Sequence, residues 1–163
     1  MARTDFSQMD CSVARTLEVI GERWSLLIVR DAFYGLRRFD DFRQDLGIAR
    51  NVLTDRLARL VDQGVFERRQ YEERPPRFEY LLTDKGRALL PVILTMMQWG
   101  DRWEAGDHGP PVTLHHRACG KVTAPVVDCE HCGGELRWDQ LLPDPIPVRL
   151  PEVSRRGSRE APA

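Results

Sequence analysis

The hydrophobic and polar positions in the middle of the chain change their repeat in a definite order. A short amphipathic segment at 39–46 is followed by a longer helical pattern at 49–63, and a glycine follows each of them. Two runs with strand-like alternation come next, 65–71 and 77–82, separated by a loop that contains two prolines. Two helices joined by a tight turn and followed at once by a hairpin are typical of a winged helix-turn-helix. The pattern therefore predicts a mainly α fold with a small β-hairpin (α+β) of this type.

Helical patterns also flank this unit. Two precede it, at 13–20, where Ser12 is the expected cap, and at 23–34. After the hairpin, Thr83 is expected to cap one long helix, 84–103, which a proline in its interior kinks locally.

The long helix is rich in apolar side chains, which occupy more than one of its faces: Leu89, Leu90, Val92, Ile93, Leu94, Met96, Met97, Trp99 and Trp103. A single small domain would not be expected to cover so much apolar surface. We therefore expect a second copy of the chain to pack there, giving a homodimer. A ligand pocket and deep packing inside the domain are the alternatives.

The 49–63 helix has the features of a recognition helix. Leu53, Leu57 and Leu60 follow each other at helical spacing and predict its buried face. Arginine and asparagine can each make two hydrogen bonds to a base edge, and threonine can contact a thymine methyl group. We therefore expect DNA contacts from the polar side chains of this helix, with a solvated polar face as the alternative: Arg50, Asn51, Thr54, Arg56 and Arg59.

The hairpin carries arginines on both sides of its tip. They are expected to contact phosphates or enter a minor groove: Arg68, Arg69, Arg74 and Arg77. Phe66, Phe78 and Tyr80 are expected to pack the hairpin against the helices instead.

Composition limits the other classes of function. The chain has 163 residues, 42% of them hydrophobic and 30% charged, with a net charge of −1. Residues 37–80 include ten arginines and nine acidic residues, so the segment has almost no excess of positive charge. Any DNA affinity therefore depends on where the charges are placed. No apolar run reaches the ~20 residues that span a membrane, and the amino terminus lacks the apolar core of a signal peptide, so we expect a cytoplasmic protein. No nucleophile–base pair, phosphate-binding glycine loop or paired carboxylates indicate an enzyme.

Five blocks of sequence, in order, resemble the HxlR family of winged helix-turn-helix regulators: Cys11 and residues 21–28, 38–42, 51–57 and 80–86. The resemblance covers about residues 9–105. It implies a dimeric bacterial transcription factor, more often a repressor than an activator, that binds double-stranded operator DNA. It also implies that the amino-terminal and carboxy-terminal helices build the dimer.

Two positions qualify the resemblance. Ala49 stands where a serine commonly caps the recognition helix of the family, and a lost cap costs about 1 kcal/mol. Cys11 matches the cysteine that senses oxidants or electrophiles in some members, which makes it a candidate redox sensor, with a plain buried cysteine as the alternative. A small-molecule or redox effector is therefore a candidate partner.

The chain changes character after 106–111, which has the composition of a linker. His116 and Cys119 precede one glycine, Cys129 and Cys132 precede another, and these four residues could hold one tetrahedral structural zinc ion. Strand-like runs at 122–127 and 135–138 favour a zinc-ribbon-like module over 112–142. His115 and His131 are alternative ligands, and a redox dithiol or a former metal site are the competing interpretations.

From residue 143 to 163 the chain is rich in proline and poor in apolar residues, so we expect a disordered tail. The leading function is a dimeric, sequence-specific transcriptional regulator with domain 9–105 on DNA. The second hypothesis is a protein-interaction module, in which the winged helix and the zinc ribbon are docking surfaces.

Overall fold

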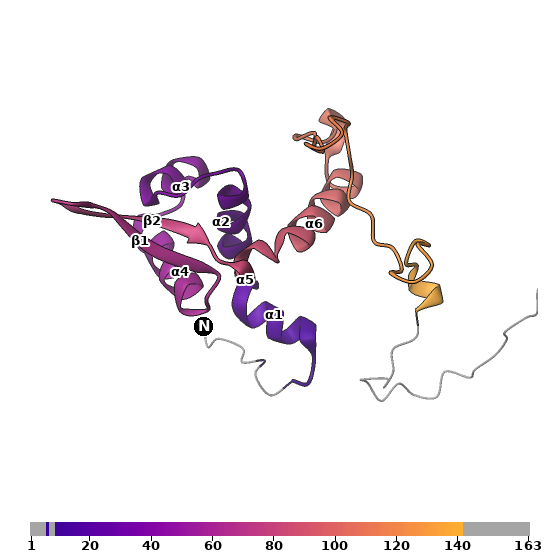
Figure 1. Cartoon of the computed structure of the whole chain (residues 1–163), viewed down its shortest axis with the longest axis horizontal. Helices are drawn as coiled ribbons and strands as arrows, with labels where there is room; N and C mark the ends of the chain where they lie inside the picture. Colours follow the sequence, from indigo (N-terminus) through magenta and orange to yellow (C-terminus); the bar gives the residue numbers. More distant parts are fainter. Residues whose placement is uncertain (1–5, 7–8, 142–163) are drawn as a thin grey trace, which may run out of the picture. The chain divides into compact units, whose positions relative to one another are not determined.

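The computed structural model describes residue 6 and residues 9–141. It divides into two compact units, one ending at Val127 and the other beginning at Asp128, and each is described by itself. In the first unit, the helices gather around the base of a two-stranded hairpin whose tip projects away from them (Figure 1). The expected tail, 143–163, lies outside the described residues.

Four helices precede the hairpin: α1 (Ser12–Ile20), α2 (Arg23–Phe33), α3 (Phe39–Leu46) and α4 (Arg50–Asp62). The order of elements in the prediction is confirmed, and Gly47 ends α3 in the left-handed conformation that glycine tolerates best. Ser12 is wrong as a cap, because it lies inside α1. Cys11 occupies the cap position instead and makes no side-chain capping bond.

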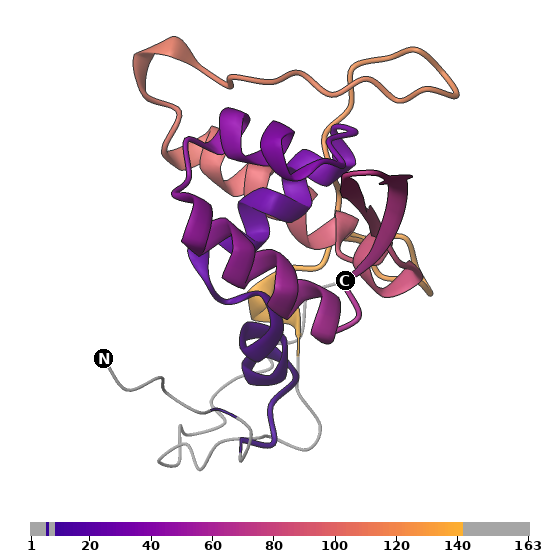
Figure 2. The ribbon, with the colours of Figure 1, turned by 90° about the vertical axis from the view of Figure 1, so that its left-hand side faces the viewer.

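The buried side chains of the core come mostly from α2, α3, α4 and the start of the first strand. Figure 2 shows the ribbon of these elements from a second side. Leu53, Leu57 and Leu60 are fully buried, so the predicted inner face of α4 is confirmed. The ring of Phe42 meets that of Phe66 edge-on, with the two centroids 6.4 Å apart. Burial of each such side chain contributes about 1.5–3 kcal/mol to folding, which fixes α3 and α4 against the base of the hairpin.

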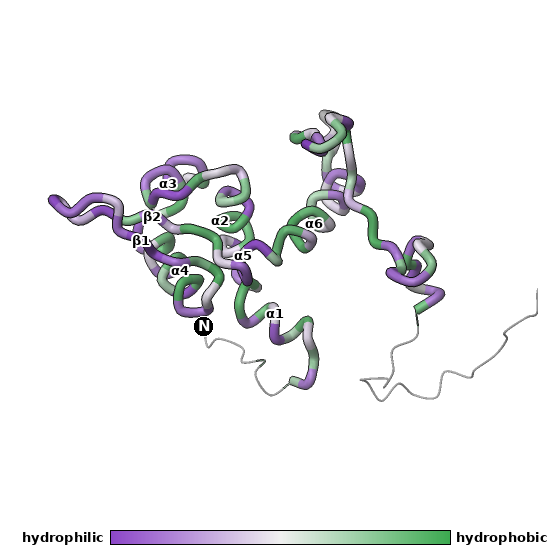
Figure 3. Tube along the Cα trace, in the orientation of Figure 1, coloured by the Kyte–Doolittle hydropathy of each residue, from purple (hydrophilic) through white to green (hydrophobic). Residues whose placement is uncertain are grey.

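The hairpin consists of β1 (Phe66–Glu73) and β2 (Pro76–Leu82), which pair antiparallel with a register shift between Gln70 and Glu72. Both strands are longer than the predicted runs, so only residues 74 and 75 remain as the turn between them. Hydrophilic residues cover the tip, whereas the base next to the helices is more hydrophobic (Figure 3).

The start of α3 is joined to the second strand. The Tyr80 N–H donates to the carbonyl oxygen of Arg37 over 2.7 Å, and Arg38 forms a single antiparallel bridge with Glu79. The segment before α3 thus continues the sheet by one short step.

The expected long helix after the hairpin is two helices, α5 (Asp84–Arg87) and α6 (Leu90–Trp103). Thr83 does cap α5, because its hydroxyl accepts the Gly86 N–H at 3.1 Å. The kink at Pro91 is a wrong prediction. Pro91 lies in the first turn of α6, where a backbone N–H has no partner within the helix, so the missing N–H of proline costs no hydrogen bond.

Short structures make up the rest of the described chain. Two 3₁₀ turns are present, η1 (Gly106–His108) and η2 (Trp138–Gln140). The predicted strands at 122–127 and 135–138 are wrong, since these segments form only single bridges, His115 with Val122 and Asp128 with Glu135. Among the described residues, no helix combines the length and the apolar character needed to span a membrane.

Candidate nucleic-acid interface

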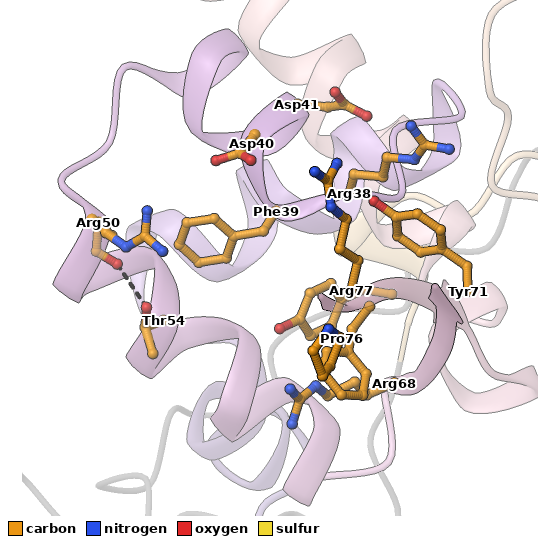
Figure 4. Close-up of a pocket in the computed structure, with 12 residues that line it drawn as sticks. Arg38, Phe39, Asp40, Asp41, Arg50, Thr54, Arg68, Tyr71, Pro76 and Arg77 are labelled. Carbon is orange, nitrogen blue, oxygen red and sulfur yellow. Dashed lines mark hydrogen bonds between the residues drawn. The ribbon is translucent and has the colours of Figure 1, made fainter. Parts of the chain in front are cut away.

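A recess of about 600 Å³ lies between the beginnings of α3 and α4 and the two strands of the hairpin (Figure 4). Guanidinium groups and aromatic rings alternate around it. The carboxylates of Asp40 and Asp41 line the recess. Four arginines line it as well: Arg38, Arg50, Arg68 and Arg77. Four positive against two negative side chains leave this surface net positive in a chain that is nearly neutral.

The amino-terminal end of α4 exposes three of the predicted DNA contacts. Arg50 lies over the ring of Phe39, with the guanidinium carbon 5.3 Å from the ring centroid. The Thr54 hydroxyl donates to the carbonyl oxygen of Arg50 over 2.9 Å, which leaves its methyl group and lone pairs for other contacts. Asn51 is exposed beside them. These side chains have the types and placement that suit base edges.

Arg56 and Arg59, which were also predicted as contacts, are engaged with other helices. Arg56 lies 3.4 Å from a carboxylate oxygen of Glu22, and its side chain is only 22% exposed. Arg59 donates to the backbone carbonyl oxygen of Glu18 in α1 over 2.8 Å. The structure therefore places these two arginines where they connect α4 to the preceding helices.

The arginines of the hairpin differ in what they contact. Arg68 stacks on Phe78 at 3.5 Å from the ring centroid. Arg69 forms an ion pair with Glu79 at 2.8 Å, and Arg77 pairs with Glu72 at 3.2 Å. Arg74 lies exposed in the turn.

Sequence reasoning overlooked Arg38, which lies over the ring of Tyr71 with 4.6 Å between the guanidinium carbon and the ring centroid. The two residues are far apart in the sequence, and only the pairing of α3 with the sheet brings them together. The signal available was weak: one more arginine at the start of an amphipathic segment.

The backbone from His116 to Gly120 forms a tight hydrogen-bonded turn. The Gly120 N–H donates to the His116 carbonyl oxygen over 2.7 Å, and the His116 N–H donates to the Lys121 carbonyl oxygen over 2.9 Å. The Cys119 sulfur lies 3.4 Å from Nδ1 of His116. Gly120 has a φ of +71°, which a glycine adopts without strain.

The turn from Cys129 to Gly133 repeats this backbone pattern. The Gly133 N–H donates to the Cys129 carbonyl oxygen over 2.8 Å, and the Cys129 N–H donates to the Gly134 carbonyl oxygen over 2.8 Å. The backbone N–H groups of Cys132 and then His131 lower the pKa of the Cys129 thiol below its ordinary value, because they stabilise the thiolate. Among the described residues, no three of the His, Cys, Asp and Glu side chains come together as a metal site, so the four-ligand set stays a prediction.

Cys11 is half-buried at the amino-terminal cap of α1, and its backbone N–H donates to Met9 over 2.8 Å. It is a free thiol at the position that the resemblance singles out.

Comparison with known proteins places the chain among regulators. Residues 19–108 match the HxlR-like helix-turn-helix family. Rv3095 of Mycobacterium tuberculosis, described as an uncharacterised HTH-type transcriptional regulator, is 46% identical over 136 residues, which cover 83% of this chain and 86% of the relative. YdeP of Bacillus subtilis, described in the same words, is 38% identical over 104 residues, or 61% of this chain and 81% of that protein.

Solved structures agree with this. PA1607, solved as a candidate transcription factor, is 41% identical and superposes with a TM-score of 0.77 over 85% of this chain and 97% of its own. The redox regulator HypR in its oxidised form is 38% identical, with a TM-score of 0.53 over 56% of this chain and 96% of its own. These relatives are regulators rather than enzymes. The chain is accordingly a member of the HxlR-like helix-turn-helix family, a DNA-binding regulator of transcription.

Proposed function

We propose that the protein is a homodimeric repressor that inserts the amino-terminal end of α4 into the major groove. Its wing, the hairpin of β1 and β2, lies along the adjacent backbone. The observation that carries this proposal is the recess, where exposed arginines from α3, α4 and the hairpin face the same side. Arg50, Asn51 and Thr54 are assigned to base edges, and Arg68, Arg74 and Arg77 to phosphates or the minor groove. Arg56 and Arg59 connect α4 to the preceding helices. Arg69 is paired with Glu79, which is only 16% exposed. Arg77 is also paired, but with the more exposed Glu72, and would exchange that partner for a phosphate.

The dimer is supported by apolar side chains that one chain leaves exposed on its first and last helices. On α6, Met96, Trp99 and Trp103 are 51%, 60% and 62% exposed, and they recur at helical spacing. On α1, Val13 and Leu17 are also largely exposed. Surfaces of this kind mark interfaces, and a two-fold partner would place two copies of α4 about one duplex turn apart.

The test is a binding selection from genomic fragments with purified protein near physiological salt. A two-fold-symmetric enriched sequence near a promoter is the expected result. Arg50→Gln should relax the sequence preference, whereas Arg74→Gln should weaken binding by a similar factor on every sequence. Equal loss on all sequences for both variants would contradict the division between base and phosphate contacts. A reporter gene behind the enriched site, repressed by the intact protein, then decides between repressor and activator.

A selection that enriches nothing, together with only weak binding that salt abolishes, would favour the protein-interaction module instead. The near-neutral charge of the chain is the observation that keeps this second candidate. Its partner would be sought by cross-linking the full chain.

We also propose that the 112–142 segment binds zinc through His116, Cys119, Cys129 and Cys132. The donor set of one imidazole and three thiols suits structural zinc, and each turn by itself presents its ligands on a glycine-ended knuckle. N–H groups that stabilise the Cys129 thiolate would favour a bound metal further. Metal analysis of chelator-rinsed protein should find about one zinc per chain, lost in Cys129→Ser and retained in Cys11→Ser. Protein without zinc would end this proposal.

Cys11 is proposed as a redox-sensing thiol, on the strength of its cap position and the likeness to HypR. Mild oxidant should then change the DNA affinity of the intact protein and leave that of Cys11→Ser unchanged. An equal response from both proteins would assign any sensing to other cysteines.

A further inference from the structure

Arg38 is held in one direction by its surroundings. Its backbone joins β2 through the bridge to Glu79, and the preceding carbonyl accepts the Tyr80 N–H. Its guanidinium lies 4.6 Å from the centroid of the Tyr71 ring. Stacking of this kind contributes about 0.5–1 kcal/mol at an exposed site, which biases the long side chain toward this orientation.

The stacked guanidinium keeps its hydrogen-bond donors. A ring occupies only a face of the planar group, so the N–H edge stays open to an anion. Among the described residues, no carboxylate lies within ion-pair distance of Arg38, in contrast to Arg69 and Arg77, which are paired with Glu79 and Glu72. Arg38 is therefore an exposed, oriented and unneutralised cation.

The place of Arg38 in the fold indicates which anion it meets. It lies at the start of α3, on the recess between the amino-terminal end of α4 and the wing. A helix in a major groove and a wing on the neighbouring minor groove must straddle the sugar–phosphate strand that separates the two grooves. The recess between them is where this strand would lie.

The geometry points to Arg38, braced by Tyr71, as an anchor for the phosphate backbone of the strand that enters this recess. The inference rests on the proposed docking of α4 and the wing. Asp40 and Asp41 line the same recess, and their carboxylates repel phosphate. The four arginines that line the recess outnumber these two carboxylates, so the loss of one arginine should weaken the attraction for the strand.

The test is the dependence of duplex affinity on salt, measured by fluorescence anisotropy on the enriched operator and on an unrelated duplex. Arg38→Gln should weaken binding to both duplexes roughly tenfold. It should also reduce the slope of log affinity against log salt by about one. The neighbouring Arg37→Gln is the matched control, because Arg37 is exposed but does not line the recess; its slope should equal that of the unmodified protein.

Variants of Tyr71 test the contribution of the stacked ring separately from the charge of Arg38. Tyr71→Phe keeps the ring and should bind DNA as the unmodified protein does, whereas Tyr71→Ala should lose affinity but keep the full salt slope, because the charge remains. Equal slopes for Arg38→Gln, Arg37→Gln and the unmodified protein would overturn the inference while leaving the proposed function in place. Absence of salt-dependent binding by the unmodified protein would instead reject the proposed function, and the inference with it. Circular dichroism melts confirm that each variant is folded.

Discussion

At the scale of single residues, Asp31 is the least expected feature of the interior. Its side chain is 1% exposed and lies in α2, the helix that precedes the helix-turn-helix. One carboxylate oxygen accepts two hydrogen bonds from Arg30, at 2.8 and 2.6 Å, and the other has no partner among the described residues. Burial raises the pKa of this carboxyl above its ordinary value of 3.8, although the contact with Arg30 opposes the shift.

The sign of the pH effect follows from that shift. With a raised pKa, the folded protein keeps the Asp31 proton to a higher pH than the unfolded chain does. The stability that the bound proton provides is therefore lost as the pH rises through the folded-state pKa. Asp31→Asn removes the ionisation, so its free energy of unfolding should fall less than that of the parent as the pH rises above the ordinary pKa of 3.8. Urea unfolding at several pH values measures this, and parallel curves for the two proteins would contradict it.

At the scale of elements, the start of α4 lacks the cap that its position calls for. Ala49 has the extended conformation of a cap residue, with φ −63° and ψ 139°, but offers no side-chain acceptor. Ala49→Ser should therefore stabilise the protein by about 1 kcal/mol. Ala58→Ser places the same hydroxyl on an exposed position inside α4 and should lower stability by up to about 0.5 kcal/mol. Chemical denaturation of both variants measures these changes in stability. Equal changes in the free energy of unfolding for the two variants would show that capping is not responsible.

Elements with a strong local signal were predictable from the sequence. The glycine after α3, the leucine spacing of α4 and the threonine cap of α5 each act within a few residues, and all three predictions are confirmed. The break between α5 and α6 was not predictable in this way, because a proline inside an apolar helical pattern is compatible with a kink or with a fresh start.

Contacts between distant segments account for the rest of what the sequence left open. Helical periodicity places Arg56 and Arg59 on a polar face of α4, but it does not say what they contact. In the structure Arg56 pairs with Glu22, and Arg59 donates to the carbonyl oxygen of Glu18. Arg38 gained its place only through the pairing of its segment with β2.

At the scale of the whole molecule, the proposed dimer depends on the exposed aromatic residues of α6. Trp99→Glu would place a charge in the middle of the proposed interface and should shift the protein from dimer to monomer, because an unpaired buried charge is strongly destabilising. Tyr34→Glu is the control, an equally drastic change of a half-exposed aromatic residue at the end of α2. Sedimentation velocity reads out both. A dimer that survives Trp99→Glu would mean that the apolar face of α6 has another use.

The hydrogen bond between Tyr80 and the Arg37 carbonyl has a consequence for how the protein tolerates variation in its operators. Because this bond ties the hairpin to the start of α3, a swing of the hairpin away from the helix-turn-helix to follow a groove of altered width would break it. We therefore expect α3, α4 and the hairpin to move together. In the proposed dimer, operators whose half-sites are spaced differently would then be accommodated by a change in the packing of α1 and α6 and not by a movement of the hairpin.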